Sequence, residues 1–199
     1  DAAYRLERVH AERIETDTVP FGCFRKALWE RVGGFNEELL ANEDYEFNYR
    51  VRQMGLAVVL DPAIRSVYVA RPTLAALAQQ YFRYGWWKAQ MLKRYPESLR
   101  WRQAVPGVFT ALLVVLVLTA MAWPGARLWL GSFLAAYLTV LLSAALHAVW
   151  KGGRRHILAV TAAFATIHLS WGSGLLTNLL TFGRWPTWRQ PTDQSDSIG

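Results

Sequence analysis

The chain has 199 residues, with 22 Lys and Arg against 15 Asp and Glu, and a formal net charge of +7. This length allows one domain, or one small domain and a membrane region. On charge alone nucleic acid is a candidate partner, but the basic residues cluster beside apolar stretches, which favours anionic lipid headgroups and argues against nucleic acid. The single cysteine, Cys23, cannot form an internal disulfide and has no Cys or His at metal-ligand spacing.

The first part of the chain predicts short strands and helices. Alternation of apolar and charged residues over 14–19 predicts a strand that ends before Pro20. A short helix is expected over 25–32, and Gly33 and Gly34 are expected to end it with a left-handed cap.

The segment 42–55 predicts a second short helix with an acidic first turn. Asn42 is expected to cap its N-terminus through the side-chain oxygen. Glu43 and Asp44 then occupy the first turn, where the helix dipole favours negative charge. Two interpretations compete for this pair: a solvated helix start stabilised by the dipole, or a general base that takes a proton from an acceptor hydroxyl.

The rest of this helix carries its packing and capping signals. Glu46 and Arg50 form an i,i+4 pair in the favourable orientation. Gly55 is expected to supply a left-handed C-terminal cap. Apolar residues at i, i+4 and i+7 predict a buried stripe made of Phe47, Val51 and Met54.

Two strands and a long helix follow. Strands are expected over 56–60 and 64–69, joined by a turn at Asp61-Pro62. Thr73 is expected to cap a helix that runs to about Tyr95. One side of this helix is apolar and rich in Trp, and the other carries Arg and Lys, which is typical of a helix that lies in the membrane interface. The alternative is an ordinary helix that faces the core.

Three apolar stretches predict membrane spans at about 105–123, 128–150 and 157–180. Basic residues precede the first span and follow the second, so the positive-inside rule places the part before the spans in the cytoplasm. The third stretch is less apolar than the other two and contains His168. A packed, hydrogen-bonded role is favoured for His168 over a functional one. We expect a span there, with a re-entrant segment as the alternative.

Several of these segments together resemble the C-terminal portion of a family-2 glycosyltransferase. Residues 32–39 read Val-Gly-Gly-Phe-Asn-Glu-Glu-Leu, residues 43–44 read Glu-Asp, and the helix that follows carries Arg50 and ends at Gly55. Order and spacing fit the family, with Asn36 in place of the usual Asp. Through residues 81–88 and the spans, the chain is most similar to the membrane-bound exopolysaccharide (succinoglycan-type) branch.

The resemblance implies a fold class and a domain order. Residues 1–71 would be the C-terminal part of an α/β catalytic domain of the glycosyltransferase type-A, nucleotide-diphospho-sugar transferase-like kind. An amphipathic interfacial helix and juxtamembrane segment would follow at 72–103, a transmembrane region at 104–182 and a disordered tail at 183–199. The nucleotide-binding half is expected upstream of this chain, so the isolated fragment is expected to be inactive.

The resemblance also implies roles for individual residues. Asp44 would be the general base of an inverting transfer and Glu43 would orient it. Gly22 and Arg25 would belong to the acceptor-side loop. Residues 79–86 loosely resemble the Gln-x-x-Arg-Trp motif of processive members. From this match Arg83 would contact diphosphate and Trp86 would stack on a sugar ring.

The implied reaction transfers a sugar from a nucleotide-sugar to a lipid-linked or polysaccharide acceptor at the inner (plasma) membrane. A divalent cation, Mg or Mn, is implied by the family. Its ligands are expected in the missing N-terminal half, with no metal ligand in this chain. Membrane lipids are further partners, and nucleic acid is not. The alternative function is a non-catalytic membrane anchor or assembly subunit of a polysaccharide-synthesis complex, in which the acidic pair would tolerate substitution.

Overall fold

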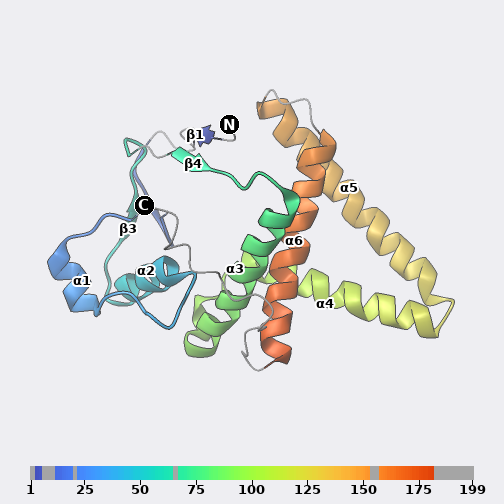
Figure 1. Cartoon of the computed structure of the whole chain (residues 1–199), viewed down its shortest axis with the longest axis horizontal. Coiled ribbons are helices and arrows are strands. Elements are labelled where there is room, and N and C mark those ends of the chain that lie inside the picture. The colour runs from blue at the N-terminus through green and yellow to red at the C-terminus, as the bar shows by residue number, and fades with distance from the viewer. Residues whose placement is uncertain (1–2, 6–11, 20–21, 65–66, 153–156, 182–199) are drawn as a thin grey trace, which may run out of the picture.

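The computed structural model is mostly helical (Figure 1) and describes residues 3–5, 12–19, 22–64, 67–152 and 157–181. The tail predicted for 183–199 lies outside these residues. The helices are α1 (Lys26–Val32), α2 (Glu43–Gln53), α3 (Leu74–Arg94), the 3-10 turn η1 (Pro96–Ser98), α4 (Trp101–Ala122), α5 (Ala126–Gly152) and α6 (Ile157–Leu180).

The described part of the chain contains four strands of three residues, which form two separate antiparallel pairs. β1 (Ala3–Arg5) pairs with β4 (Val67–Val69), and β2 (Ile14–Thr16) pairs with β3 (Val58–Leu60). The described residues therefore form no mixed sheet, and β2 and β3 are shorter than the stretches 14–19 and 56–60 that predicted them. A pair with no third strand has little apolar surface to cover, which limits its length and stability.

The first two helices each end at a glycine with a left-handed backbone, as predicted. Gly33 caps α1 with φ 90° and Gly55 follows α2 with φ 75°, both in the left-handed region where a Cβ is disfavoured. Phe47 and Val51 of α2 are buried and pack with Val58 of β3. Met54 was expected in the same stripe but is 38% exposed, because it lies at the C-cap, where the helix leaves the core.

The side chain of Asn42 does not cap α2, contrary to the prediction. Asn42 has φ 65°, and its amide nitrogen donates to the backbone oxygen of Tyr84 on α3 at 3.1 Å. The left-handed backbone at Asn42 turns the amide away from the first turn of α2. The same residue thus joins α2 to a helix 42 positions later.

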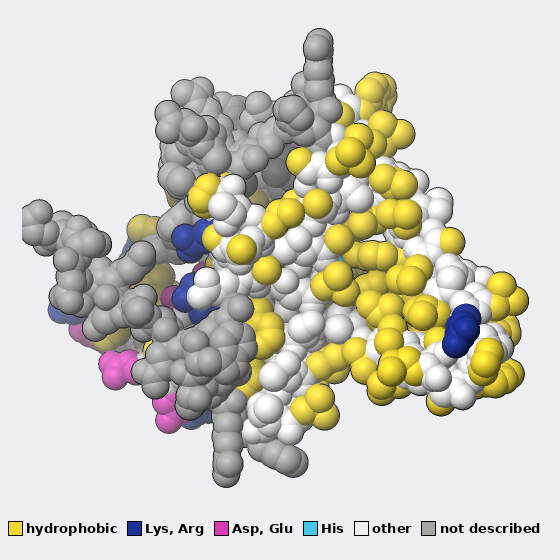
Figure 2. Space-filling view, turned by 45° about the vertical axis from the view of Figure 1, so that its right-hand side comes forward, with side chains coloured by type: hydrophobic (Ala, Val, Ile, Leu, Met, Phe, Trp, Pro, Cys, Tyr) yellow, Lys and Arg dark blue, Asp and Glu magenta, His cyan; other side chains and the backbone are white. Residues whose placement is uncertain are grey.

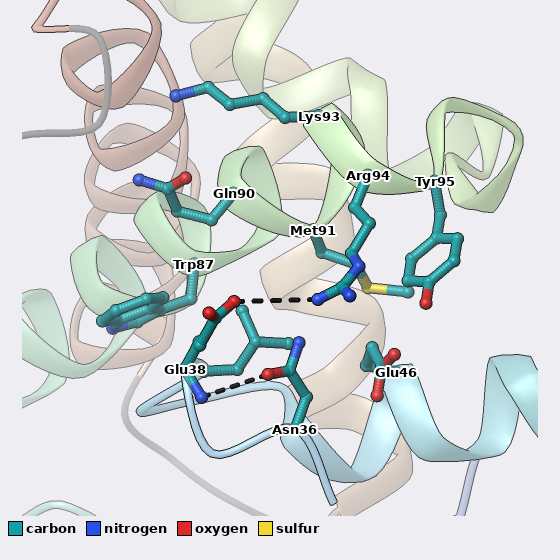
Figure 3. Close-up of a pocket in the computed structure, with 10 residues that line it drawn as sticks. Asn36, Glu38, Glu46, Trp87, Gln90, Met91, Lys93, Arg94 and Tyr95 are labelled. Atoms are coloured by element: carbon teal, nitrogen blue, oxygen red, sulfur yellow. Dashed lines mark hydrogen bonds and ion pairs between the residues drawn. The ribbon is translucent and has the colours of Figure 1, made fainter. Parts of the chain in front are cut away.

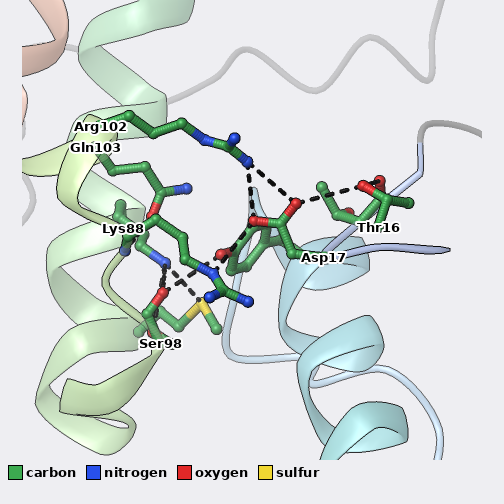
Figure 4. A network of polar contacts seen from close by, with 10 residues as sticks. Thr16, Asp17, Lys88, Ser98, Arg102 and Gln103 are labelled. Carbon is green, nitrogen blue, oxygen red and sulfur yellow. Dashed lines mark hydrogen bonds and ion pairs between the residues drawn. The ribbon is translucent and has the colours of Figure 1, made fainter. Parts of the chain in front are cut away.

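A buried polar junction joins α2, α3 and η1 (Figure 4). Lys88 on α3 is 3% exposed, and its Nζ donates to the backbone oxygen of Ser98 at 3.2 Å and to the Ser98 hydroxyl at 3.3 Å. The same Nζ lies 4.1 Å from the ring centroid of Tyr45, a cation–π contact. Burial lowers the pKa of Lys88 from its ordinary 10.5 to about 8. Attraction by Asp17 opposes this shift.

The long helix α3 is confirmed, and the Thr73 hydroxyl caps it by accepting from the Ala76 backbone N–H at 3.1 Å. It packs along α6 in the same direction (Figure 1). A Cβ built at Gly174 would lie 2.0 Å from the backbone oxygen of Phe82, and one built at Gly85 would lie 2.0 Å from that of Trp171. Only glycine permits this approach, which resembles small-residue packing in membrane helices.

The packing of α3 differs from that of a helix with one free polar face. Gln80 and Lys88 belong to the polar side of this helix, and both are buried. The described contacts therefore agree with the core-facing alternative, and a position of α3 at a membrane surface stays a prediction.

The helices α4, α5 and α6 are long and apolar enough to cross a membrane. Many large apolar side chains of α4 and α5 are exposed, and Figure 2 shows hydrophobic side chains gathered over this part of the molecule. His168 of α6 lies 3.3 Å from the hydroxyl of Tyr137 on α5, so its packed, hydrogen-bonded role is confirmed.

The glycine contact between α3 and α6 predicts the effect of a single methyl group. Gly174→Ala should lower the free energy of unfolding by about 1–3 kcal/mol, because the new Cβ meets backbone that no rotamer change can move. The matched control is Gly131→Ala on α5, where a Cβ meets nothing within 4 Å. Unfolding in detergent should separate the two variants, and equal stability would contradict the packing.

The buried Lys88 predicts a pH dependence of stability. Between about pH 8 and 10.5 the unfolded chain holds a proton that the folded chain has lost, so stability should rise with pH over this window. Lys88→Met should flatten that rise, since the titrating group is gone. Lys93→Met, at an exposed site on the same helix, should keep the wild-type slope. Unfolding titrations from pH 7 to 10.5 measure both slopes, and an unchanged slope in Lys88→Met would refute the assignment.

Candidate functional site

The acidic pair lies in the first turn of α2, and both side chains are exposed. Asp44 Oδ1 accepts from the backbone N–H of Tyr45 at 2.7 Å, which fixes the direction of the carboxylate. Tyr45 itself is buried, and its hydroxyl donates to the backbone oxygen of Ser98 at 3.3 Å. An exposed carboxylate is thus held on a helical turn whose next residue is anchored in the core.

An ion pair with a buried carboxylate holds α2 against the loop at Gly33-Gly34, here called the glycine loop. Glu46 is 1% exposed, and its two oxygens accept from Arg50 Nε and Nη2, both at 2.8 Å. Two further donors of the same guanidinium reach the backbone oxygens of Val32 and Gly34. These four hydrogen bonds use four of the five N–H donors of the guanidinium, so it sets the loop and the helix in one geometry.

The predicted diphosphate and sugar contacts on α3 lie in different environments. Arg83 is half-buried, and its Nε has no hydrogen-bond partner among the described residues. Trp86 has no exposed surface, and its ring stacks on that of Phe82 with centroids 6.4 Å apart. In this conformation a sugar ring cannot reach Trp86, so its stacking role would require α3 to move.

The other two predicted residues lie before and at the start of α1. Gly22 is exposed, and a Cβ there would meet only ordinary van der Waals contacts. Arg25 is the exposed N-cap residue of α1. Within the described part of the chain, neither makes a hydrogen bond or ion pair with Glu43 or Asp44, and their acceptor-side roles stay predictions.

A groove of about 480 Å³ lies between the loop at 36–39 and the C-terminal half of α3 (Figure 3). An ion pair closes one side, with Arg94 Nη1 at 3.7 Å from Glu38 Oε2. Burial and the nearby Glu46 carboxylate raise the pKa of Tyr95 on its wall. The lining is mostly polar and aromatic: Asn36, Glu38, Leu39, Glu46, Trp87, Gln90, Met91, Lys93, Arg94 and Tyr95.

Sequence reasoning did not find this groove. The signal on α3 was the spacing of Trp87, Gln90 and Arg94 at i, i+3 and i+7, which places them on one helix face. The loop that faces them is 50 residues away in sequence, and nothing local pairs the two. The acidic pair does not line the groove, although Glu46 of the same helix does.

No group of three His, Cys, Asp or Glu side chains with metal-binding geometry occurs in the described ranges. Glu43 and Asp44 are the nearest approach to a hard-oxygen donor set at the predicted site, and two adjacent carboxylates fall short of the ligands that Mg²⁺ usually takes. A cation would therefore need ligands from elsewhere, and its presence stays a prediction.

Comparison with known proteins gives one family and one relative. The family described as glycosyl transferase family 21 matches residues 21–178. The succinoglycan biosynthesis protein ExoA of Rhizobium meliloti (strain 1021) is 30% identical over 163 residues. That alignment covers 80% of this chain and 47% of the relative, so the chain spans about half the length of the curated relative it matches. No solved structure matches significantly.

These matches confirm the resemblance to glycosyltransferases of the exopolysaccharide branch, while the narrower family-2 assignment stays a prediction. The matched region contains the glycine loop, the acidic turn of α2, the whole of α3 and most of the apolar helices. The chain therefore belongs to glycosyl transferase family 21.

Proposed function

We propose that this chain forms the acceptor-side part of a membrane-bound glycosyltransferase. It would act in transfer of a sugar from a nucleotide-sugar to a lipid-linked or polysaccharide acceptor. The observation that carries the proposal is the exposed carboxylate of Asp44 on a helical turn anchored by Tyr45. Family membership and the relative in succinoglycan biosynthesis support the reaction class.

The proposed mechanism is a single displacement with inversion. Asp44 takes the proton of an acceptor hydroxyl, and the oxygen attacks the anomeric carbon of the donor. The bond from that carbon to the nucleotide diphosphate breaks as the new glycosidic bond forms. Glu43 is the proposed orienting neighbour, and Arg83, with an unpartnered Nε, is the proposed diphosphate contact. Mg²⁺ or Mn²⁺ would supply charge stabilisation of the leaving diphosphate, with ligands outside the described residues.

The proposed place is the inner (plasma) membrane, with the acidic turn on the cytoplasmic side. Three apolar helices and exposed apolar surface on α4 and α5 support membrane association. Charge supports the orientation, since Arg100 and Arg102 lie at the start of the first apolar helix and only Arg127 lies near the turn that follows it.

A second candidate function is a non-catalytic anchor or assembly subunit of a polysaccharide-synthesis complex. The large exposed apolar surface of α4 and α5 favours it, because such a surface suits helix partners as well as lipid. This alternative predicts that both members of the acidic pair tolerate substitution.

Sugar transfer by the full-length protein tests the two candidates. Asp44→Asn should lower transfer of radiolabelled sugar from nucleotide-sugars into membrane lipid by about 10²–10⁴-fold, the usual contribution of a general base. Stability should not change, since the Asp44 side chain is exposed. Glu30→Gln, an exposed substitution on α1, is the activity control. Full transfer by Asp44→Asn would eliminate Asp44 as the base and favour the anchor.

A further inference from the structure

A cluster of charged side chains lies where α2, α3 and η1 meet the end of β2 and the start of α4 (Figure 4). Arg100 Nε lies 3.4 Å from Asp17 Oδ2, and Arg102 Nη2 lies 3.1 Å and 3.2 Å from the two oxygens of Asp17. The charge of Asp17 raises the pKa of Lys88, and the charges of Arg100 and Arg52 lower it. We call these five residues the Asp17 cluster.

The Asp17 cluster contains four cationic side chains and one carboxylate. The carboxylate of Glu97 on η1 accepts from the hydroxyl of Tyr49 and, among the described residues, forms no ion pair with the cluster. Lys88 is 3% exposed, so its charge is fixed in place and poorly screened by water. The cluster therefore has an excess of positive charge that an anion could neutralise.

Donors remain available in this cluster. Arg100 and Arg102 expose 48% and 65% of their side chains, and Asp17 engages only part of each guanidinium. Arg52 Nε is buried and has no hydrogen-bond partner in the part of the chain that the structure describes. A tetrahedral phosphate group matches several N–H donors that converge from different directions.

The cluster lies at the start of α4, the first helix that is long and apolar enough to cross a membrane. Trp101 is 81% exposed and Val105 is 52% exposed, so apolar surface begins directly beyond the cluster. Exposed Trp at the end of an apolar helix is typical of the depth where headgroups lie. The N-terminus of α4 adds a partial positive charge at the same place.

The cluster also contacts the helix that carries the proposed base. Lys88 Nζ lies against the ring of Tyr45, the residue that follows Asp44. A phosphate held there would therefore lie next to α2, on the membrane side of the molecule.

We propose that the Asp17 cluster binds a phosphate group carried by a membrane lipid, and that this lipid is the acceptor of the sugar. The second half of this inference rests on the proposed function. It narrows the acceptor from a lipid or a polysaccharide to a lipid with a phosphate or diphosphate next to its sugar. An ordinary anionic phospholipid offers the same chemistry, and the experiment separates the two.

The test is equilibrium binding of a radiolabelled short-chain polyprenyl diphosphate to the full-length protein in neutral detergent. Arg102→Gln should weaken binding about tenfold, since one charge-assisted contact is lost while Arg100 still pairs with Asp17. Asp17→Asn should tighten binding severalfold, because the competing carboxylate is removed. A merely structural ion pair would give weaker binding or no change in both variants.

Arg127→Gln is the matched control, because it removes an exposed Arg near the other end of α4 and should leave binding unchanged. Competition then identifies the source of the phosphate. Weak competition by phosphatidylglycerol and by inorganic pyrophosphate supports the acceptor lipid. Equal competition by phosphatidylglycerol would assign the cluster to ordinary headgroups and overturn the acceptor assignment, and equal competition by pyrophosphate would overturn the role of the lipid.

Binding that is insensitive to Arg102→Gln and Asp17→Asn would overturn the site itself. This readout is independent of catalysis. Asp44→Asn should bind the polyprenyl diphosphate as wild type does, so failure of the base assignment and failure of the phosphate site give different results.

Discussion

The geometry of the site depends on the guanidinium of Arg50. It joins Glu46 of its own helix to the backbone oxygens of Val32 and Gly34, so a single side chain connects α1, the glycine loop and α2. Loss of Arg50 would cost about 3–5 kcal/mol, because the buried carboxylate of Glu46 would be left without compensation. The exposed acidic turn lies directly before this pair. The pair therefore holds the backbone of Glu43 and Asp44 in a fixed position, although neither side chain is buried.

The apolar helices also help to position the acidic turn of α2. Gly85 and Gly174 let α3 and α6 approach to backbone contact, and α3 in turn holds α2 through Asn42 and Lys88. The position of the acidic turn is therefore linked to the last apolar helix through α3. In the proposed mechanism, this link would fix the position of Asp44 relative to the apolar helices.

The sequence predicted those features of the fold that depend on residues close together in the chain. The ends of α1 and α2 followed from Gly33 and Gly55, and the pair of Glu46 and Arg50 followed from spacing of one helical turn. Contacts between distant segments could not be predicted in this way. Examples are the bond from Asn42 to Tyr84, the burial of Trp86 and Lys88, and the groove against the 36–39 loop. The α/β fold that the resemblance implies appears, among the described residues, with only two short antiparallel pairs of strands.

The stereochemistry of the product tests the central claim most directly. The full-length protein would be supplied with a nucleotide-sugar of known anomeric configuration, and the new glycosidic linkage would be determined by nuclear magnetic resonance. A base at Asp44 that activates the acceptor for a single displacement predicts inversion at the anomeric carbon. Retention would contradict the account, since it requires either two displacements or attack on the same face as the leaving group.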